Sequence, residues 1–184
     1  QAPTFVLLKA LTGSVGWTVG HTSIGFTKRL KLNGTDAESA SANFFNDTEP
    51  TSSLITLGAN NVSNDFIMYS WHDVPGLQKF GQFTANASTD GPFVELGFRP
   101  SILWVKASSS AGDMSYASWL IVDGERSPTN PVNKALFANK SAAEGKRGNG
   151  SDSYTDTWLD ILSNGFKIRY NGTEVNGVSS QTYI

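Results

Sequence analysis

Short apolar runs separated by turn residues dominate the hydrophobic pattern of this chain. The runs are rich in β-branched and aromatic residues, and Gly, Asn, Asp, Ser or Pro bounds each of them. They are Phe5–Lys9, Gly16–Val19, Leu54–Leu57, Phe66–Trp71, Phe80–Thr84, Phe93–Leu96, Ile102–Lys106, Trp119–Val122 and Phe166–Tyr170. Asn-Gly pairs at residues 33, 164, 171 and 176 supply the positive-φ positions that tight hairpins require. The pattern predicts an all-β, antiparallel fold.

Helix is predicted only as isolated turns. Asp36–Ala42 and Ser141–Lys146 are rich in Ala, Glu and Lys. Each could form a single helical turn. Nothing longer is predicted, because segments this short are not stable as helices without tertiary packing.

The chain contains an internal repeat. The segment APTFVLLKALTGSVG at residues 2–16 returns as FRPSILWVKASSSAG at residues 98–112. The matched positions are Pro3 with Pro100, Lys9 with Lys106, Trp17 with Trp119, Leu30 with Leu136, Asn33 with Asn139, Glu38 with Glu144, Ile55–Leu57 with Phe166–Ile168, and Phe66–Ile67 with Tyr183–Ile184. The offset rises from 97 to 117 along the chain, so the second copy has longer loops between the same strands.

The repeat predicts two tandem β units. Residues 1–75 form the first repeat, without equivalents of the strands that precede the second copy, and residues 76–184 form the second. The second copy stops at Tyr183-Ile184, in the middle of a strand by this alignment. We therefore expect the chain to be part of a longer array, with neighbouring segments or chains covering the open strands.

Several phrases of the second copy resemble a known family. GLQKFGQFTANASTDGPFVELGFRPSILWVK, followed by LDILSNGFKIR, is similar to repeat domains in bacteriophage virion proteins, which are common in marine and cyanobacterial phages. The resemblance covers residues 77–184, and residues 3–74 match more loosely. It implies a concanavalin/SPRY-type β-sandwich, a jelly roll, in a fibre-like or lectin-like protein at the particle surface. It carries no catalytic motif that can be transferred to this chain.

Charge and composition exclude some partners. The net charge of −2 offers no basic surface for nucleic acid, and no apolar run approaches the roughly 20 residues of a membrane-spanning helix. The chain has no cysteine, so disulfides and cysteine-based metal sites are impossible. We expect neither nucleic acid nor membrane as a partner.

Candidate catalytic groups are sparse. His21 and His72 are the two histidines, and His72-Asp73 could form part of a Ser-His-Asp arrangement. Neither histidine recurs where the copies can be compared, which favours polar residues at strand ends. Glu38 and Glu144 recur singly, as a cap or surface partner would, whereas glycosidic cleavage needs paired acids. We predict a non-enzymatic protein.

Metal and cofactor sites are also not expected. The loops Asp152–Asp156 and Asn43–Glu49 carry oxygen ligands, but neither matches a calcium-binding pattern, so solvated loops are favoured. The alternating segment Lys28–Leu32 is explained by the solvated face of a strand. Seven Asn-x-Ser/Thr sequons begin at residues 33, 46, 61, 86, 139, 149 and 171, and we interpret them as turn residues.

Aromatic residues in loop-like segments are the remaining candidates for ligand binding. They are Trp158, Tyr154, Tyr116, Phe44 and Phe45. Exposed rings could stack on sugars, although packing in the core or in a subunit interface is the commoner role.

The repeat also predicts which residues are buried. In the second copy these are Phe93, Ile102, Trp104, Trp119, Leu136, Phe166 and Ile168; in the first they are Phe5, Leu7, Trp17, Leu30, Ile55 and Leu57. We expect other virion subunits as partners, in a homo-oligomer that is a trimer or a filament.

Two functions agree with these features. The first is a structural module of a phage appendage or capsid surface, as fibre or decoration. The second is a lectin-like module for host attachment that recognises cell-surface glycan. A lectin should show a concave site with one or two aromatic rings, whereas a structural module should bury its aromatics in the core or at interfaces.

Overall fold

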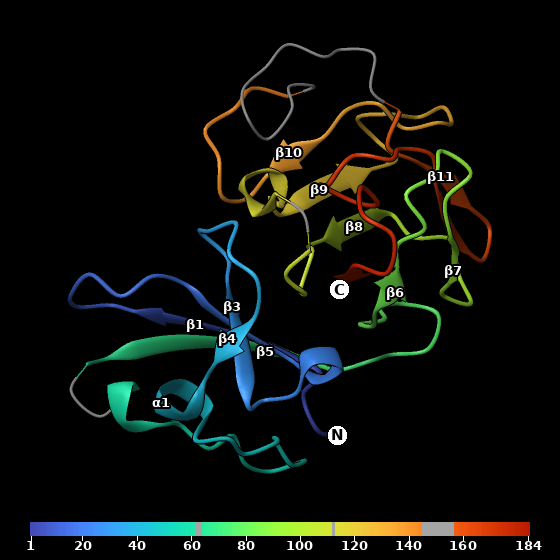
Figure 1. Cartoon of the computed structure of the whole chain (residues 1–184). Helices are drawn as coiled ribbons and strands as arrows, with labels where there is room; N and C mark the ends of the chain where they lie inside the picture. Colours follow the sequence, from blue (N-terminus) through green and yellow to red (C-terminus); the bar gives the residue numbers. More distant parts are fainter. Residues whose placement is uncertain (62–63, 112, 145–156) are drawn as a thin grey trace.

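Antiparallel strands make up most of the regular structure of the chain. The computed structural model describes residues 1–61, 64–111, 113–144 and 157–184, and within them the all-β prediction is confirmed (Figure 1). The strands are β1 Phe5–Ala10, β2 Thr18–His21, β3 Lys28–Lys31, β4 Ser39–Ala40, β5 Phe66–Trp71, β6 Phe83–Thr84, β7 Phe93–Glu95, β8 Ile102–Val105, β9 Leu120–Asp123, β10 Leu136–Phe137, β11 Leu159–Leu162, β12 Gly165–Ile168 and β13 Thr182–Tyr183. The helical elements are α1 Ala42–Phe45 and the 3-10 turns η1 Thr22–Ile24, η2 Ala59–Asn61 and η3 Met114–Tyr116.

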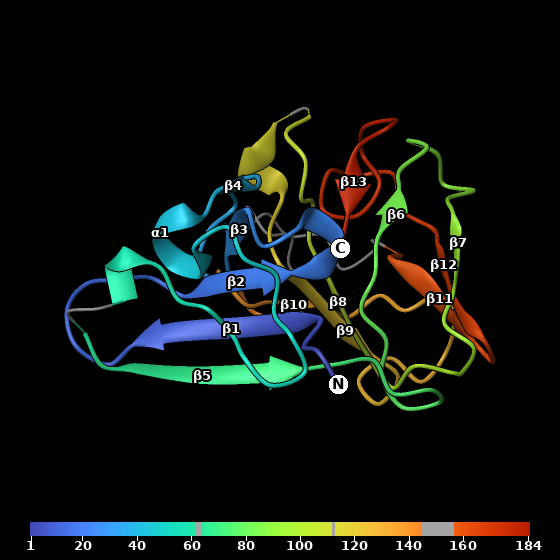
Figure 2. The ribbon, with the colours of Figure 1, turned by 90° about the horizontal axis from the view of Figure 1, so that it is seen from below.

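The first half of the chain forms one sheet in the order β4-β3-β2-β1-β5. β1, β2 and β5 lie side by side in Figure 2. Successive side chains of a strand point to opposite faces. Val6 and Leu8 therefore pack on one face with Phe26, Phe44 and Phe45, so that α1 covers this face.

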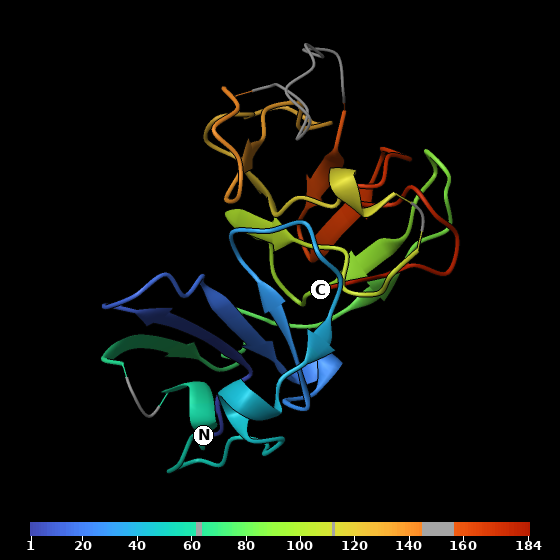
Figure 3. The same cartoon turned by 60° about the vertical axis from the view of Figure 1, so that its left-hand side comes forward.

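The second half contains two three-stranded sheets, β10-β9-β8 and β11-β12-β7, and a small pair, β13-β6. Figure 3 shows this half beside the first. Leu103 and Val105 of β8 alternate inward and share one core cluster with Leu159, Ile161 and Phe166 of the other sheet. Apolar side chains from the two sheets thus form the core of this half.

The two halves share a strand register. In the first, Leu7 of β1 lies opposite Val19 of β2, which lies opposite Leu30 of β3. In the second, Trp104, Ile121 and Leu136 are paired in the same way across β8, β9 and β10. The next strand also agrees: Lys9 pairs with Ile67, and Lys106 exchanges two backbone hydrogen bonds with Ile184. The residues matched by sequence occupy equivalent places in the pairing.

Recurring asparagines hold equivalent turns. Asn33 Oδ1 accepts a hydrogen bond of 3.1 Å from the backbone N–H of Trp17. Asn139 Oδ1 accepts one of 2.9 Å from the N–H of Trp119. Both asparagines belong to sequons, and both use their side chains for local geometry.

The predicted strand Leu54–Leu57 is wrong. These residues form no strand, although the residues matched to them, Phe166–Ile168, lie in β12. The hydroxyl of Thr51 accepts hydrogen bonds from the N–H groups of Ser53 and Leu54. This local turn competes with strand pairing.

The predicted helical turns need correction as well. The helix is not at Asp36–Ala42 but at Ala42–Phe45, where Phe44 and Phe45 are buried and Asn46 ends it in the left-handed conformation. Residues 141–144 are not helical, and the rest of Ser141–Lys146 lies outside the described residues.

The burial prediction holds for some residues and fails for others. Phe5, Leu7, Leu30, Trp119, Phe166 and Ile168 are buried, and Trp17 and Ile55 are half-buried. Phe93, Ile102, Trp104, Leu136 and Leu57 are exposed. In β8 the cause is alternation, because Leu103 and Val105 face the core and their neighbours face outward.

The asparagine turns generate a matched prediction. The substitution Asn139→Ala leaves the backbone N–H of buried Trp119 without its acceptor, so we expect the free energy of unfolding to fall by about 1–2 kcal/mol. The hydrogen bond of Asn33 is solvent-exposed. Asn33→Ala should therefore lower the free energy of unfolding by less than about 1 kcal/mol. Urea titrations of both variants measure the difference, and equal losses would contradict this explanation.

Candidate functional site at the junction of the two halves

An apolar cluster joins the two halves. Phe5, Leu7, Val19 and Leu30, on the face of the first sheet opposite to α1, pack around Trp119 of the second half. The Trp119 indole N–H also donates a hydrogen bond of 2.8 Å to the carbonyl oxygen of Lys31. A large ring with its polar atom paired is therefore inserted from one half into the other.

The amino group of Lys106 is a second connection. Its Nζ donates to the carbonyl oxygens of Thr35 at 3.2 Å and Asp36 at 3.0 Å in the first half, and to Ala107 at 2.6 Å in its own. Burial lowers the pKa of Lys106 to about 8, and the negative charge of Asp36 opposes this shift. The group is thus protonated at neutral pH, and its three donors meet three acceptors.

The matched lysine in the first half makes a local contact. Lys9 Nζ donates to the carbonyl oxygen of Val15 at 2.8 Å, within its own half. The two matched lysines therefore differ in role. Lys106 connects the two halves, whereas Lys9 fixes a loop within the first half.

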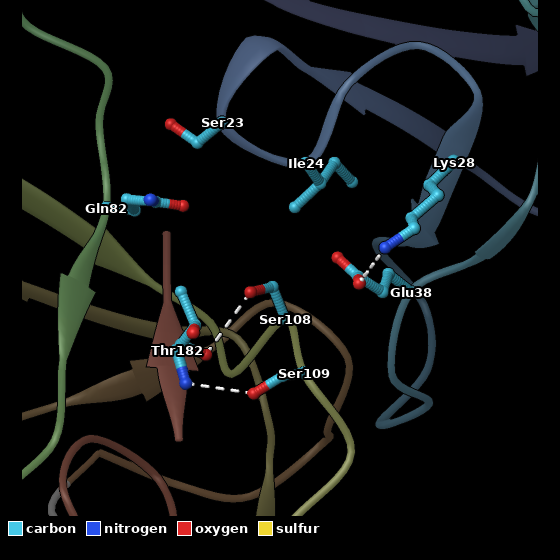
Figure 4. Close-up of a pocket in the computed structure, with 8 residues that line it drawn as sticks. All are labelled: Ser23, Ile24, Lys28, Glu38, Gln82, Ser108, Ser109 and Thr182. Carbon is cyan, nitrogen blue, oxygen red and sulfur yellow. Dashed lines mark hydrogen bonds and ion pairs between the residues drawn. The ribbon is translucent and has the colours of Figure 1, made fainter. Parts of the chain in front are cut away.

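A polar pocket lies beside these connections (Figure 4). Its volume is about 220 Å³, and it is lined by Ser23, Ile24, Lys28, Glu38, Gln82, Ser108, Ser109 and Thr182. Lys28 and Glu38 form an ion pair on one side, and the backbone N–H of Glu38 donates to the Ser108 carbonyl at 2.8 Å. In Figure 4, Ser23 and Gln82 lie apart from the ion pair. Hydroxyl and amide groups suit a small polar ligand.

The aromatic residues predicted to bind ligand lie elsewhere. Phe44, Phe45 and Trp158 are buried, so as candidates for ligand binding they are corrected, and they have the commoner role of core packing. Their segments look like loops, yet their rings fill the two cores: Phe44 and Phe45 pack under the first sheet, and Trp158 contacts Tyr170 with ring centroids 4.8 Å apart. These rings have no free face for a sugar.

The other two aromatic candidates do not line the pocket either. Tyr116 is exposed at the end of η3 and is not among the lining residues. Tyr154 lies outside the described residues.

The histidine and acid candidates have structural partners. Buried His21 accepts a hydrogen bond of 3.0 Å from the Ser23 N–H at Nδ1. Burial lowers the pKa of His21 to about 4, and Asp73 opposes the shift. The Asp73 carboxylate itself accepts a hydrogen bond of 2.9 Å from the backbone N–H of Phe80. The carboxylate beside His72 is thus engaged with the main chain.

The two recurring glutamates make surface ion pairs. Glu38 pairs with Lys28, and Glu144 lies within 3.7 Å of Arg126 and 3.8 Å of Lys134. Each glutamate is therefore paired with basic side chains, which agrees with the predicted role as a surface partner.

Of the two loops considered for metal binding, only Asn43–Glu49 lies within the described residues, and Asp152–Asp156 lies outside them. Within the described part of the chain, no group of three or more His, Asp or Glu side chains could hold a metal ion. The Glu49 carboxylate accepts a hydrogen bond of 2.9 Å from the backbone N–H of Phe26. None of the helices described here is long and apolar enough to cross a membrane.

The pocket could not be found from the sequence because its residues come from six separate segments of the chain.

A comparison with family models matches residues 1–184 to a domain of unknown function, DUF7483. The chain belongs to the DUF7483 family. No curated protein and no solved structure matches it. The DUF7483 match spans both halves and the junction.

The Lys106 contacts generate a prediction with an internal control. Lys106→Met leaves the Thr35 and Asp36 carbonyls unpaired, so we expect the free energy of unfolding to fall by about 3 kcal/mol. Lys9→Met removes a single, half-buried contact and should cost less than about 1 kcal/mol. Chemical denaturation of both variants tests this, and a Lys9 effect as large as that of Lys106 would disprove the role of the junction.

His21 generates a pH-dependent prediction. Its pKa is about 4 when folded and 6.5 when unfolded, so between these values the unfolded chain binds more protons. Stability should therefore be lost as the pH falls through this range, by about 2 kcal/mol between pH 7 and pH 5. Asn at position 21 does not titrate but can still accept the Ser23 N–H. His21→Asn should remove this component from the pH dependence of urea unfolding, and an unchanged slope would refute it.

Proposed function

We propose that the chain is a non-enzymatic structural module at the surface of a virion, in an appendage or on the capsid. The observation that supports this most is the junction, where Trp119 and Lys106 of one half bond to main-chain carbonyls of the other. Hydrogen bonds to main-chain acceptors hold the two halves in one arrangement. A structural module needs such a fixed arrangement of its parts. The resemblance to phage virion repeats supplies the setting.

We propose further that residues 1–75 and 76–184 are two tandem β-sandwich repeats of the jelly-roll type. The shared register of β1–β2–β3 and β8–β9–β10 supports a common ancestry for these strands. The core between two facing sheets in the second half supports the sandwich architecture.

A lectin-like role in host attachment is the second candidate. The pocket favours it, because hydroxyl, amide and charged groups converge on a cavity of about 220 Å³. However, no aromatic ring is among its eight lining residues, and Phe44, Phe45 and Trp158 are in the cores. The structural role is therefore the better supported of the two.

The structural role predicts where the protein is found. Antibodies raised against the folded chain should label purified phage particles at regular positions in negative-stain electron micrographs. Pre-immune serum and antibody absorbed with the chain are the controls. Absence of the chain from particles whose genome encodes it would refute the proposal.

Carbohydrate assays separate the alternatives. We expect no retention on a glycan array and no new reducing ends from host-envelope polysaccharides. Binding that is lost in Gln82→Ala and kept in Gln78→Ala would favour the lectin, because Gln82 lines the pocket and Gln78 does not. Release of reducing ends would overturn the non-enzymatic assignment.

A further inference from the structure

Matched faces of the two sheets differ in what covers them. In the first half, Phe5, Leu7, Val19 and Leu30 are buried under Trp119. Their matched residues in the second half are apolar too, but Ile102 is 57% exposed, Trp104 41% and Leu136 38%, and Ile121 is half-buried. We call Ile102, Trp104, Ile121 and Leu136 the docking face. The docking face corresponds to the surface that Trp119 covers in the first half, but its own side chains remain largely exposed.

The opposite part of the junction is also reproduced. The residues of the second half that meet the first include Ser108, Trp119 and Ile184. Their matched residues in the first half are Leu11, 65% exposed, Trp17, half-buried, and Ile67, 38% exposed. We call Leu11, Trp17 and Ile67 the docking end. Apolar side chains that are exposed or half-buried therefore mark both partners of the same contact.

One polar contact of the junction, the indole hydrogen bond, can form again as well, whereas Lys9 is engaged with Val15 and does not repeat the contacts of Lys106. The Lys31 carbonyl accepts the N–H of Gly34 at 3.3 Å and still receives the Trp119 indole. The matched Phe137 carbonyl accepts the N–H of Lys140 at 3.2 Å, which leaves one lone pair. Within the described residues, the indole N–H of Trp17 has no hydrogen-bond partner, so it is available as the donor.

We propose that the docking face binds the docking end of a second copy of this chain, in a head-to-tail contact that repeats the junction between the halves. Trp17 of one copy lies on Ile102, Trp104 and Leu136 of the next and donates its indole N–H to the Phe137 carbonyl. A second copy is thus the partner of the proposed structural module. The docking contact depends on the proposed function only for its location in a virion.

Such a contact has a definite assembly behaviour. The two surfaces are different, so each copy keeps one of each free after pairing. Copies therefore add in a row, and the array closes only if their rotation completes a ring.

Two single variants block the contact from opposite sides. Trp104→Asp places a charge on the docking face, and Leu11→Asp places one on the docking end; both side chains are exposed, so the fold should tolerate the change. Ile102→Asp is a second face variant in case Trp104→Asp unfolds. Leu54→Asp is the matched control, because Leu54 is 62% exposed and belongs to neither surface.

Sedimentation velocity measures the association over a concentration series up to about 0.5 mM, a range in which weak contacts are populated. The unchanged protein and Leu54→Asp should form species larger than a dimer, whereas Trp104→Asp and Leu11→Asp should each remain at the 19.8 kDa of one chain. An equimolar mixture of the two should form a dimer of twice that mass and nothing larger, because only one intact face meets one intact end.

Three outcomes overturn the inference. They are an unchanged protein that stays monomeric, association that survives in both blocked variants, and a mixture that fails to form the dimer. The virion labelling described above is independent of these results. Loss of self-association with positive labelling removes the docking contact alone, and the reverse result removes the virion setting alone.

Discussion

One buried ammonium group holds the arrangement of the two halves. Lys106 Nζ has three donors and is shielded from water, so removing any of its carbonyl acceptors would leave a buried charge poorly compensated. Two of these acceptors, in Thr35 and Asp36, belong to the loop after β3. These bonds hold that loop close to β3, whose Lys31 carbonyl accepts the Trp119 indole N–H.

The strand-forming segments and the correspondence between the two halves could be predicted from the sequence because both rest on local patterns. The recurrence of Lys9 at Lys106 and of Ile67 at Ile184 identified residues that occupy equivalent places, since Lys9 pairs with Ile67 and Lys106 with Ile184. β11 was missed for an equally local reason. Its Asp160 breaks the apolar run, and nothing in the sequence shows that Arg169 neutralises this carboxylate at 2.6 Å.

The pattern does not specify which face of a strand is covered. Trp104 and Leu7 are equivalent in register, yet one is exposed and the other buried, because burial depends on what packs above the sheet. Trp158 and Phe45 show the reverse case. Their neighbours read as loop, whereas the rings fill space beneath sheets formed by residues far away in the sequence. The pocket is harder still, since its walls meet only once both halves are folded.

The pairing of Lys106 with Ile184 also bears on the order of folding. The β8–β9 and β11–β12 hairpins join residues close in sequence, but this pair closes a loop of almost eighty residues. Long loops lose more entropy on closure, so contacts of this kind form late. Because the side chain of the same lysine reaches Thr35 and Asp36, completion of the second half and its attachment to the first should occur in one kinetic step.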